Sequence, residues 1–219
     1  MIKFEDVTKT YHIRKFHKKV LNPLSFEIQR GASLGICGAN GAGKSTLMRL
    51  ISGVEAPSSG RVMREGSCSW PIGYSSCFQS TLTGADNARF IARIYGREID
   101  PLLDYVEDFA QLGAYFHQPI YSYSAGMLAR LAFGISLAID FDCYLVDEVT
   151  AAGDDRFRQR CADALHYRRE MGTLVMISHD PGTLQLYCTT GAVLNGGNLV
   201  FYDTIEEAIA VHLHNQSIQ

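Results

Sequence analysis

Hydrophobic and polar positions alternate along the first 35 residues, as they do in half-buried strands. The alternation predicts strands over IKFEDV and LSFEIQ, and the basic stretch HIRKFHKK between them predicts a solvated hairpin tip. The apolar run SLGIC then leads into a glycine-rich turn. A helix is expected next, because Leu47, Leu50 and Ile51 recur at helical spacing.

The pattern changes to helices over about Leu82–Ser124, where Pro101, Gly113 and Pro119 mark the expected boundaries. Strand signals return in CYLVDE and TLVMISHD, with a polar helix over Asp155–Met171 between them. Alternating strands and helices predict a mainly parallel sheet that is covered by helices on both faces.

The last elements are predicted to be a hairpin and a helix. GAVLNGGNLVFY contains an Asn-Gly-Gly-Asn turn, whose residues tolerate positive φ. Thr204 and Glu207 form a capping box for the helix that follows.

Composition narrows the class of protein. The chain has 219 residues, a net charge of -3 and a hydrophobic content of 47%, which suits one large domain or a core with an inserted lobe. Nothing resembles the basic face of a nucleic-acid-binding domain, so we expect no nucleic acid partner. The longest apolar run, around Leu131–Ile139, is far shorter than the roughly 18 residues of a membrane helix, and no apolar signal region opens the chain. We therefore expect a soluble cytosolic chain.

The cysteines are scattered without CxxC spacing, several of them inside apolar runs, and are expected to be small core residues. Cys161, His166 and His179 fit no common metal-ligand pattern. No metal or redox role is assigned to them.

A phosphate-binding loop is predicted over GANGAGKS, Gly38–Ser45, which follows an apolar strand and opens a helix. Its glycines let backbone N–H groups turn toward phosphates, and the helix N-terminus adds its positive dipole end. Lys44 is expected to reach the β- and γ-phosphates, and the Ser45 hydroxyl to bind Mg²⁺. The expected nucleotide contacts in and beside this loop are Gly38, Ala39, Asn40, Gly41, Ala42, Gly43, Lys44, Ser45 and Thr46.

Two acids follow the predicted strand CYLV. Asp147 is expected to serve Mg²⁺ at the carboxyl end of that strand, where open α/β sheets bind ligands. Glu148 is expected to orient or deprotonate an attacking water, which favours hydrolysis over nucleotide storage. A kinase is the rival enzymatic interpretation, but nothing in the sequence marks a pocket for a second substrate.

Taken in order, the motifs GANGAGKST, Gln79, YSAGM, YLVDE, AAGD and ISHD resemble the nucleotide-binding subunits of ABC transporters over nearly the whole chain. The resemblance implies an α/β P-loop NTPase fold with a RecA-like core, an N-terminal antiparallel β subdomain and an inserted helical subdomain. It implies a single domain over 1–219, with the core at about 1–80 and 135–219 and the helical insertion at about 81–134.

The resemblance also assigns roles to single residues. Tyr11 resembles the aromatic residue that stacks on adenine, although an aromatic at a strand end is also common in cores. Gln79 resembles the glutamine that senses Mg²⁺ and the γ-phosphate. His179 resembles the histidine that hydrogen-bonds the γ-phosphate, and Asp154 resembles an aspartate at the dimer interface.

YSAGM, Tyr123–Met127, occupies the place of the family's signature sequence LSGGQ. Ser124, Ala125 and Gly126 are expected to face the γ-phosphate of an ATP held by a second copy of the chain. Tyr123, Ala125 and Met127 depart from the usual pattern, as does Val149, where proline is usual.

The stretches SWPIG, FQSTLTGADNARFIARIYG and DEVTAAGDDRF are similar to ATPases that power polysaccharide export, above all of bacterial capsule. Because the chain ends at Gln219, no C-terminal sugar-binding domain is expected. The resemblance implies ATP and Mg²⁺, a homodimer, an integral membrane permease, and a peripheral location on the cytoplasmic face of the inner membrane. An exporter of O-antigen or teichoic acid type, and a non-transport module that dimerises on ATP, remain alternatives.

Overall fold

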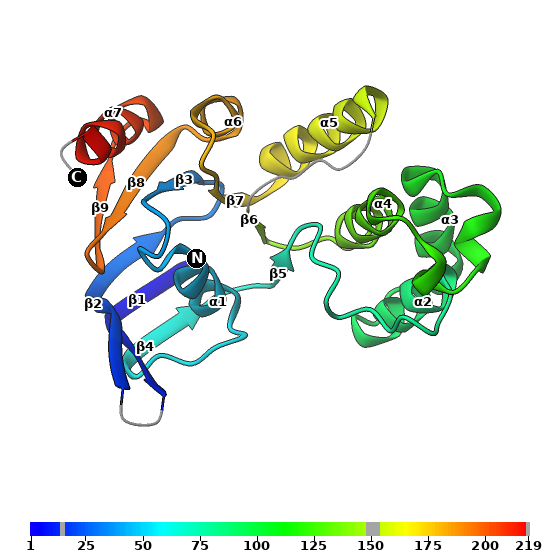
Figure 1. Cartoon of the computed structure of the whole chain (residues 1–219), viewed down its shortest axis with the longest axis horizontal. Coiled ribbons are helices and arrows are strands. Elements are labelled where there is room, and N and C mark those ends of the chain that lie inside the picture. The colour runs from blue at the N-terminus through cyan, green and yellow to red at the C-terminus, as the bar shows by residue number, and fades with distance from the viewer. Residues whose placement is uncertain (14–15, 148–153, 218–219) are drawn as a thin grey trace. The chain divides into compact units, whose positions relative to one another are not determined.

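The computed structural model describes residues 1–13, 16–147 and 154–217 (Figure 1). It contains two compact units. The first unit comprises the described residues of Met1–Ser69, Phe141–Glu148 and Arg168–Gln219, and the second comprises those of Trp70–Asp140 and Val149–Tyr167.

A three-stranded antiparallel sheet in the order β2-β1-β4 opens the first unit, with β1 at Ile2–Ile13, β2 at Phe16–Ile28 and β4 at Ser59–Arg64. Both β1 and β2 extend much further than the alternating stretches predicted. His12 pairs with His17, so most of the basic stretch expected to be a hairpin tip is strand. The exposed basic end of the hairpin is confirmed, but the strands were expected to be too short, because charged residues are accommodated on exposed strand ends that continue to pair.

The second sheet has six strands in the order β5-β6-β7-β3-β8-β9. Strands β6, β7, β3 and β8 pair in parallel, and β9 pairs with β8 antiparallel. Gly196 and Gly197 make the predicted turn at positive φ, 54° and 78°. The bounds are β3 Ser33–Cys37, β5 Cys68–Pro71, β6 Cys143–Asp147, β7 Thr173–Ile177, β8 Thr190–Asn195 and β9 Asn198–Tyr202.

Both faces of this sheet are covered, as the alternation of strands and helices predicted. Leu34 and Ile36 point into a core that also contains the apolar side of α1 (Lys44–Ser52). Gly35, between them, faces the other side, where a Cβ would lie 2.6 Å from Ile205 Cδ1. That side carries helices α6 (Pro181–Tyr187) and α7 (Ile205–Ser217).

One of the two hydrogen bonds of the capping box predicted for α7 is present, because the backbone N–H of Glu207 donates to Thr204 Oγ1 at 3.3 Å.

Across residues 1–13, 16–147 and 154–217, no helix has the length and apolar character needed to cross a membrane. Four of the six cysteines are buried, as expected for core residues, whereas Cys68 is half-buried and Cys77 is exposed.

Helices dominate the second unit: α2 (Gly84–Ile94), α3 (Ile99–Ala110), α4 (Ala125–Leu137) and the short 3-10 helices η1 (Gly113–His117) and η2 (Ile120–Ser122). Helix α5 (Asp155–Met171), whose first part belongs here, has the predicted bounds.

Pro101 was predicted to mark a helix boundary, but it lies inside the first turn of α3. Proline is tolerated there because the first turn of a helix needs no backbone donor. Gly113 opens η1 and Pro119 directly precedes η2, so these two boundaries are confirmed.

Candidate functional site

Three neighbouring parallel strands of the first unit bring the predicted site residues to one edge of the sheet. The loop Gly38–Ser45 follows β3, Asp147 ends β6, and His179 lies two residues after β7. Because β7 lies between β6 and β3 and all three are parallel, their carboxyl ends meet at this edge. Open α/β sheets bind ligands at such an edge.

The loop Gly38–Ser45, which we call the phosphate loop, requires glycine at particular places. Gly41 and Gly43 have φ of 80° and 108°. A Cβ at Gly38 would lie 2.6 Å from the Leu194 carbonyl oxygen, and one at Gly43 would lie 2.8 Å from Val20 Cγ1. The backbone is thus held in a tight turn that other residues would disturb.

The N-terminus of α1 is suited to bind an anion. Gly43 occupies the N-cap position without a side chain that could accept from the first backbone N–H groups, and the first turn contains no acid. These donors and the positive end of the helix dipole are the features that bind phosphate groups. The residues present therefore fit a polyphosphate.

Lys44 places a positive charge inside the loop. The residue is only 9% exposed, and its Nζ donates to the carbonyl oxygens of Gly38 at 2.7 Å and Ala39 at 3.1 Å. A buried ammonium group needs hydrogen-bond partners, and here they are neutral carbonyl groups. The charge of Lys44 consequently remains uncompensated by these partners, which favours an anionic ligand.

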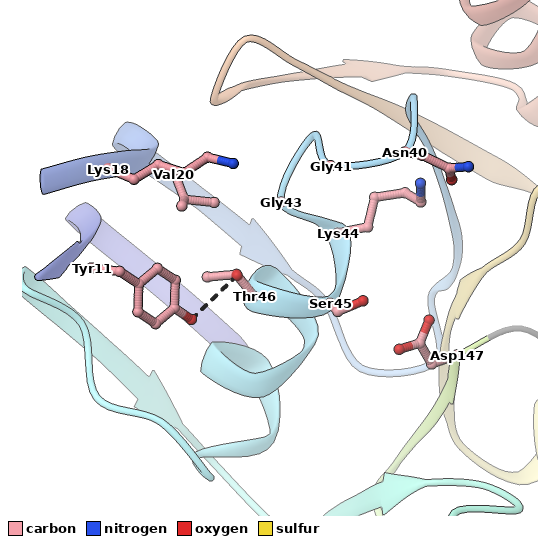
Figure 2. A pocket seen from close by; sticks show the side chains of 10 residues that line it. All are labelled: Tyr11, Lys18, Val20, Asn40, Gly41, Gly43, Lys44, Ser45, Thr46 and Asp147. Carbon is pink, nitrogen blue, oxygen red and sulfur yellow. Dashed lines mark hydrogen bonds between the residues drawn. The ribbon is translucent and has the colours of Figure 1, made fainter. Parts of the chain in front are cut away.

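A cavity of about 490 Å³ extends along this loop (Figure 2). The Ser45 hydroxyl and the Asp147 carboxylate lie on one side of α1 in this view, and Tyr11 and Val20 lie on the other. The lining residues are Tyr11, Lys18, Val20, Asn40, Gly41, Gly43, Lys44, Ser45, Thr46 and Asp147. A hydroxyl and a carboxylate are ligands that Mg²⁺ accepts.

Lys18 and Val20 were missed by the sequence analysis because the stretch containing Lys18 was interpreted as a hairpin tip. The strand register pairs Lys18 with Tyr11, and both Lys18 and Val20 line the same cavity as Tyr11. If the two strands had been predicted to continue past Tyr11, Lys18 and Val20 would have been expected on the strand that pairs with it.

The hydroxyl of Tyr11 is held by a network of polar side chains. It donates to Glu55 Oε2 at 2.8 Å and accepts from Arg49 at 3.0 Å. Glu55 also pairs with Lys9 at 2.8 Å. Burial raises the pKa of the Glu55 carboxyl, but hydrogen bonds from Lys9, Tyr11 and Arg49 outweigh it and lower this pKa to about 2. The network fixes the phenol by its oxygen while the side chain lines the cavity.

His179 is exposed and lies next to a capped helix. Asp180 caps α6, accepting from the backbone N–H of Thr183 at 2.9 Å, and the Thr183 hydroxyl also donates to it and lowers the pKa of the Asp180 carboxyl. His179 is not among the described residues that line the cavity, although it follows β7, whose carboxyl end lies beside those of β3 and β6.

The remaining predicted residues that the structure describes belong to the second unit. Ser124 caps α4, accepting from the Met127 backbone N–H at 3.2 Å, and Ser124 and Ala125 are exposed. At Gly126, a Cβ would meet only Ser124 Oγ, at 3.9 Å. The N-terminus of this helix is therefore accessible around the predicted signature residues.

Asp154 caps α5 and pairs with Arg130 at 3.0 Å. The Phe157 backbone N–H and the Arg130 side chain lower the pKa of its carboxyl. Gln79 is exposed, and its side-chain Nε2 donates to Thr81 Oγ1 at 3.3 Å. Glu148 and Val149 lie outside the described residues.

Comparisons with known proteins agree on one family. A family model described as ABC transporter matches residues 21–151. The ATP-binding protein BexA of Haemophilus influenzae is 44% identical, covering 99% of this chain and 100% of that protein. The capsule polysaccharide export ATP-binding protein CtrD of Neisseria meningitidis serogroup B is 46% identical, covering 95% and 96%. A solved dimeric ATP-binding cassette with ADP and phosphate shares the fold, with a TM-score of 0.78 and 20% identity, covering 92% and 98%.

Proposed function

We propose, from the premise that this chain belongs to the ABC transporter family, that it is the ATP-binding and ATP-hydrolysing subunit of a capsular polysaccharide exporter. The observation that carries the proposal is a cavity lined by residues of the phosphate loop and by Asp147, in a chain that aligns almost end to end with the capsule polysaccharide export protein CtrD.

ATP is the nucleotide that this cavity would hold. Gly38–Ser45 and the N-terminus of α1 provide backbone donors for its phosphates, together with Thr46 in the first turn, and Lys44 provides the positive charge. Tyr11 and Val20 offer an aromatic and an apolar surface for the adenine. The network at the Tyr11 hydroxyl keeps the ring in place before the nucleotide arrives.

Mg²⁺ fits the oxygen donors at the other side of the cavity. Ser45 and Asp147, which line the cavity, would hold it. Gln79 is proposed as a further ligand because of its place in the order of the family's motifs. The ion would neutralise charge on the phosphate oxygens. Glu148 is proposed as the residue that orients or deprotonates water, and His179 as a hydrogen-bond partner of the γ-phosphate.

A second copy of the chain is proposed to complete the site. The accessible N-terminus of α4 at Ser124, Ala125 and Gly126 suits a phosphate brought by another molecule, since it carries an uncompensated dipole end. Asp154 would lie at the interface between the copies. The solved cassettes with the same fold include dimeric ones, which agrees with this arrangement.

The exporter also needs an integral membrane permease, which we propose as the partner that anchors the chain peripherally at the cytoplasmic face of the inner membrane. ATP binding would bring two copies together and hydrolysis would separate them, so that the cycle drives the permease. Selection of the polysaccharide is assigned to the permease.

Lys44→Ala in the organism that encodes the chain tests this function. We expect the variant to be made at normal levels, polysaccharide to accumulate inside the cells, and surface polysaccharide to fall at least tenfold, because loss of charge-assisted hydrogen bonds of about 1.5–3 kcal/mol each weakens nucleotide binding. Lys19→Ala, an exposed lysine outside the cavity lining, is the matched control. Normal surface polysaccharide in Lys44→Ala cells would refute the proposal.

A further inference from the structure

The backbone of Gln79 is held by one buried side chain of the second unit. The N–H of Gln79 donates to Asn87 Oδ1 at 2.9 Å, and Asn87 Nδ2 donates to the Gln79 carbonyl oxygen at 3.2 Å. The same Nδ2 donates to the Thr83 carbonyl oxygen at 2.9 Å. The Gln79 N–H is thus held by the Asn87 side-chain amide, and the Gln79 carbonyl oxygen also accepts from the backbone N–H of Leu82 at 3.1 Å.

Only asparagine has the chemistry that these contacts require at this size. The N–H of Gln79 needs an acceptor and its carbonyl needs a donor, so the hydrogen bonds themselves determine which end of the Asn87 amide is oxygen. Aspartate could accept but not donate, and an apolar side chain could do neither. Asn87 is 2% exposed, so water cannot replace its contact with the Gln79 N–H, and the loss of this contact leaves that donor unsatisfied.

The far end of the same segment is also held. The carbonyl oxygens of Ser80 and Leu82 accept from the backbone N–H groups of Tyr121 and Ile120, each at 3.0 Å, and Thr83 forms a β-bridge with Pro119. Segment Gln79–Thr83 is therefore bonded at both ends, whereas the Gln79 side chain itself is exposed.

We infer that Asn87 is a positioning residue for ATP hydrolysis, acting through Gln79. It fixes the backbone that carries the Gln79 side chain, which is proposed above as a ligand of Mg²⁺. The inference rests on the proposed role of Gln79 in the ATP site and adds the residue that sets its position. Asn87 itself touches neither nucleotide nor metal.

A double-mutant cycle in the full-length chain tests the inference, with kcat and KM for ATP measured for Asn87→Ala, Gln79→Ala and the double variant. We expect each single variant to lower kcat by about tenfold, since one lost interaction of about 1.4 kcal/mol in the transition state has that effect. KM should stay within about twofold. The double variant should be no slower than Gln79→Ala alone, because Asn87 acts only through that side chain.

Thr83→Ala is the matched control, because it removes the cap of the same helix, where the Asp86 N–H donates to Thr83 Oγ1 at 2.9 Å. It should lower the melting temperature while leaving kcat unchanged. A double variant about a hundredfold slower than the unmodified chain would show independent effects and overturn the inference. A similar loss of kcat in Thr83→Ala would also overturn it.

The cycle separates this inference from the function it rests on. If the unmodified chain hydrolyses no ATP, the proposed function fails. If Gln79→Ala is as active as the unmodified chain, the role of Gln79 fails and the inference with it. Should Asn87→Ala not fold, hydrogen exchange in the unmodified chain decides: slow exchange of the Gln79 amide is expected, and exchange as fast as in an unstructured peptide would contradict the contact.

Discussion

Lys44 illustrates how a single residue prepares the site for its ligand. Its ammonium group is buried against the carbonyl oxygens of Gly38 and Ala39, without an acid among these partners. Neutral partners satisfy the hydrogen bonds but not the charge. The loop consequently offers a phosphate both a cation and backbone donors before any nucleotide binds.

Glu55 does not line the cavity, but it accepts a hydrogen bond from the hydroxyl of Tyr11, which does. Since its folded-state pKa of about 2 is below the value in an unfolded chain, Glu55 stabilises the fold above pH of about 4.5 and loses this effect as the pH falls toward 2. Glu55→Gln should therefore lower the free energy of unfolding by about 1 kcal/mol at pH 7, the upper range for an ion pair near the surface, and by less at pH 3.

Denaturant unfolding at pH 7, 4.5 and 3 measures this difference. Glu65→Gln, an exposed acid outside the Lys9, Glu55 and Arg49 cluster, is the control and should change stability little. A stability loss in Glu55→Gln that is the same at all three pH values would show that the carboxylate charge is not responsible.

Single-residue roles were predictable where the motif is local. The phosphate loop is contiguous in sequence, so its residues and the glycine requirements could be anticipated together. The roles of Lys18, Val20 and Asn87 could not be predicted from the sequence, because they depend on strand pairing and on hydrogen bonds between segments rather than on neighbouring residues in the chain.

At the scale of elements, the strongest predictions were those with both a clear pattern and defined ends. Helix α5 begins and ends as predicted because polar residues repeat over its whole length between two strands. The hairpin of β1 and β2 was misjudged because charge was taken to end the strands, although their backbones continue to pair. Pro101 was misjudged because a first-turn proline leaves a helix intact.

The N-terminus of α4 is the element for which a mutation separates folding from assembly. Gly126→Asp should fold, since a Cβ there has open space within the chain and an acid in the first turn is favourable by about 0.3–1 kcal/mol. Its carboxylate should nevertheless repel the phosphate of a partner's ATP. We expect an unchanged or higher melting temperature and no ATP-dependent dimer.

Gly126→Asn, of the same size but neutral, is the matched control and should retain part of the dimerisation. Analytical ultracentrifugation with and without ATP measures both variants. If Gly126→Asp dimerises with ATP as the unmodified chain does, the N-terminus of α4 does not receive the phosphate.

For the whole molecule, the fold class followed from the alternation of strands and helices and from the order of the motifs, and the mixed α/β fold confirms it. The order of strands in the six-stranded sheet could not be read from the sequence, because β3, the third strand along the chain, lies between β7 and β8. Such neighbours are decided by long-range packing. The extent of the helical insertion, 81–134, stays a prediction.

The central claim is that two copies of the chain share two ATP sites. Each copy contributes the phosphate loop to one site and the N-terminus of α4 to the other. Glu148→Gln tests it most directly, because the variant should bind ATP and Mg²⁺ without hydrolysing it and so accumulate the assembled state. The measurement is its mass in solution by light scattering with and without Mg-ATP. We predict a monomer without nucleotide and a stable dimer with it, and Lys44→Ala in the same background should stay monomeric. A Glu148→Gln chain that binds ATP and remains monomeric would contradict the claim.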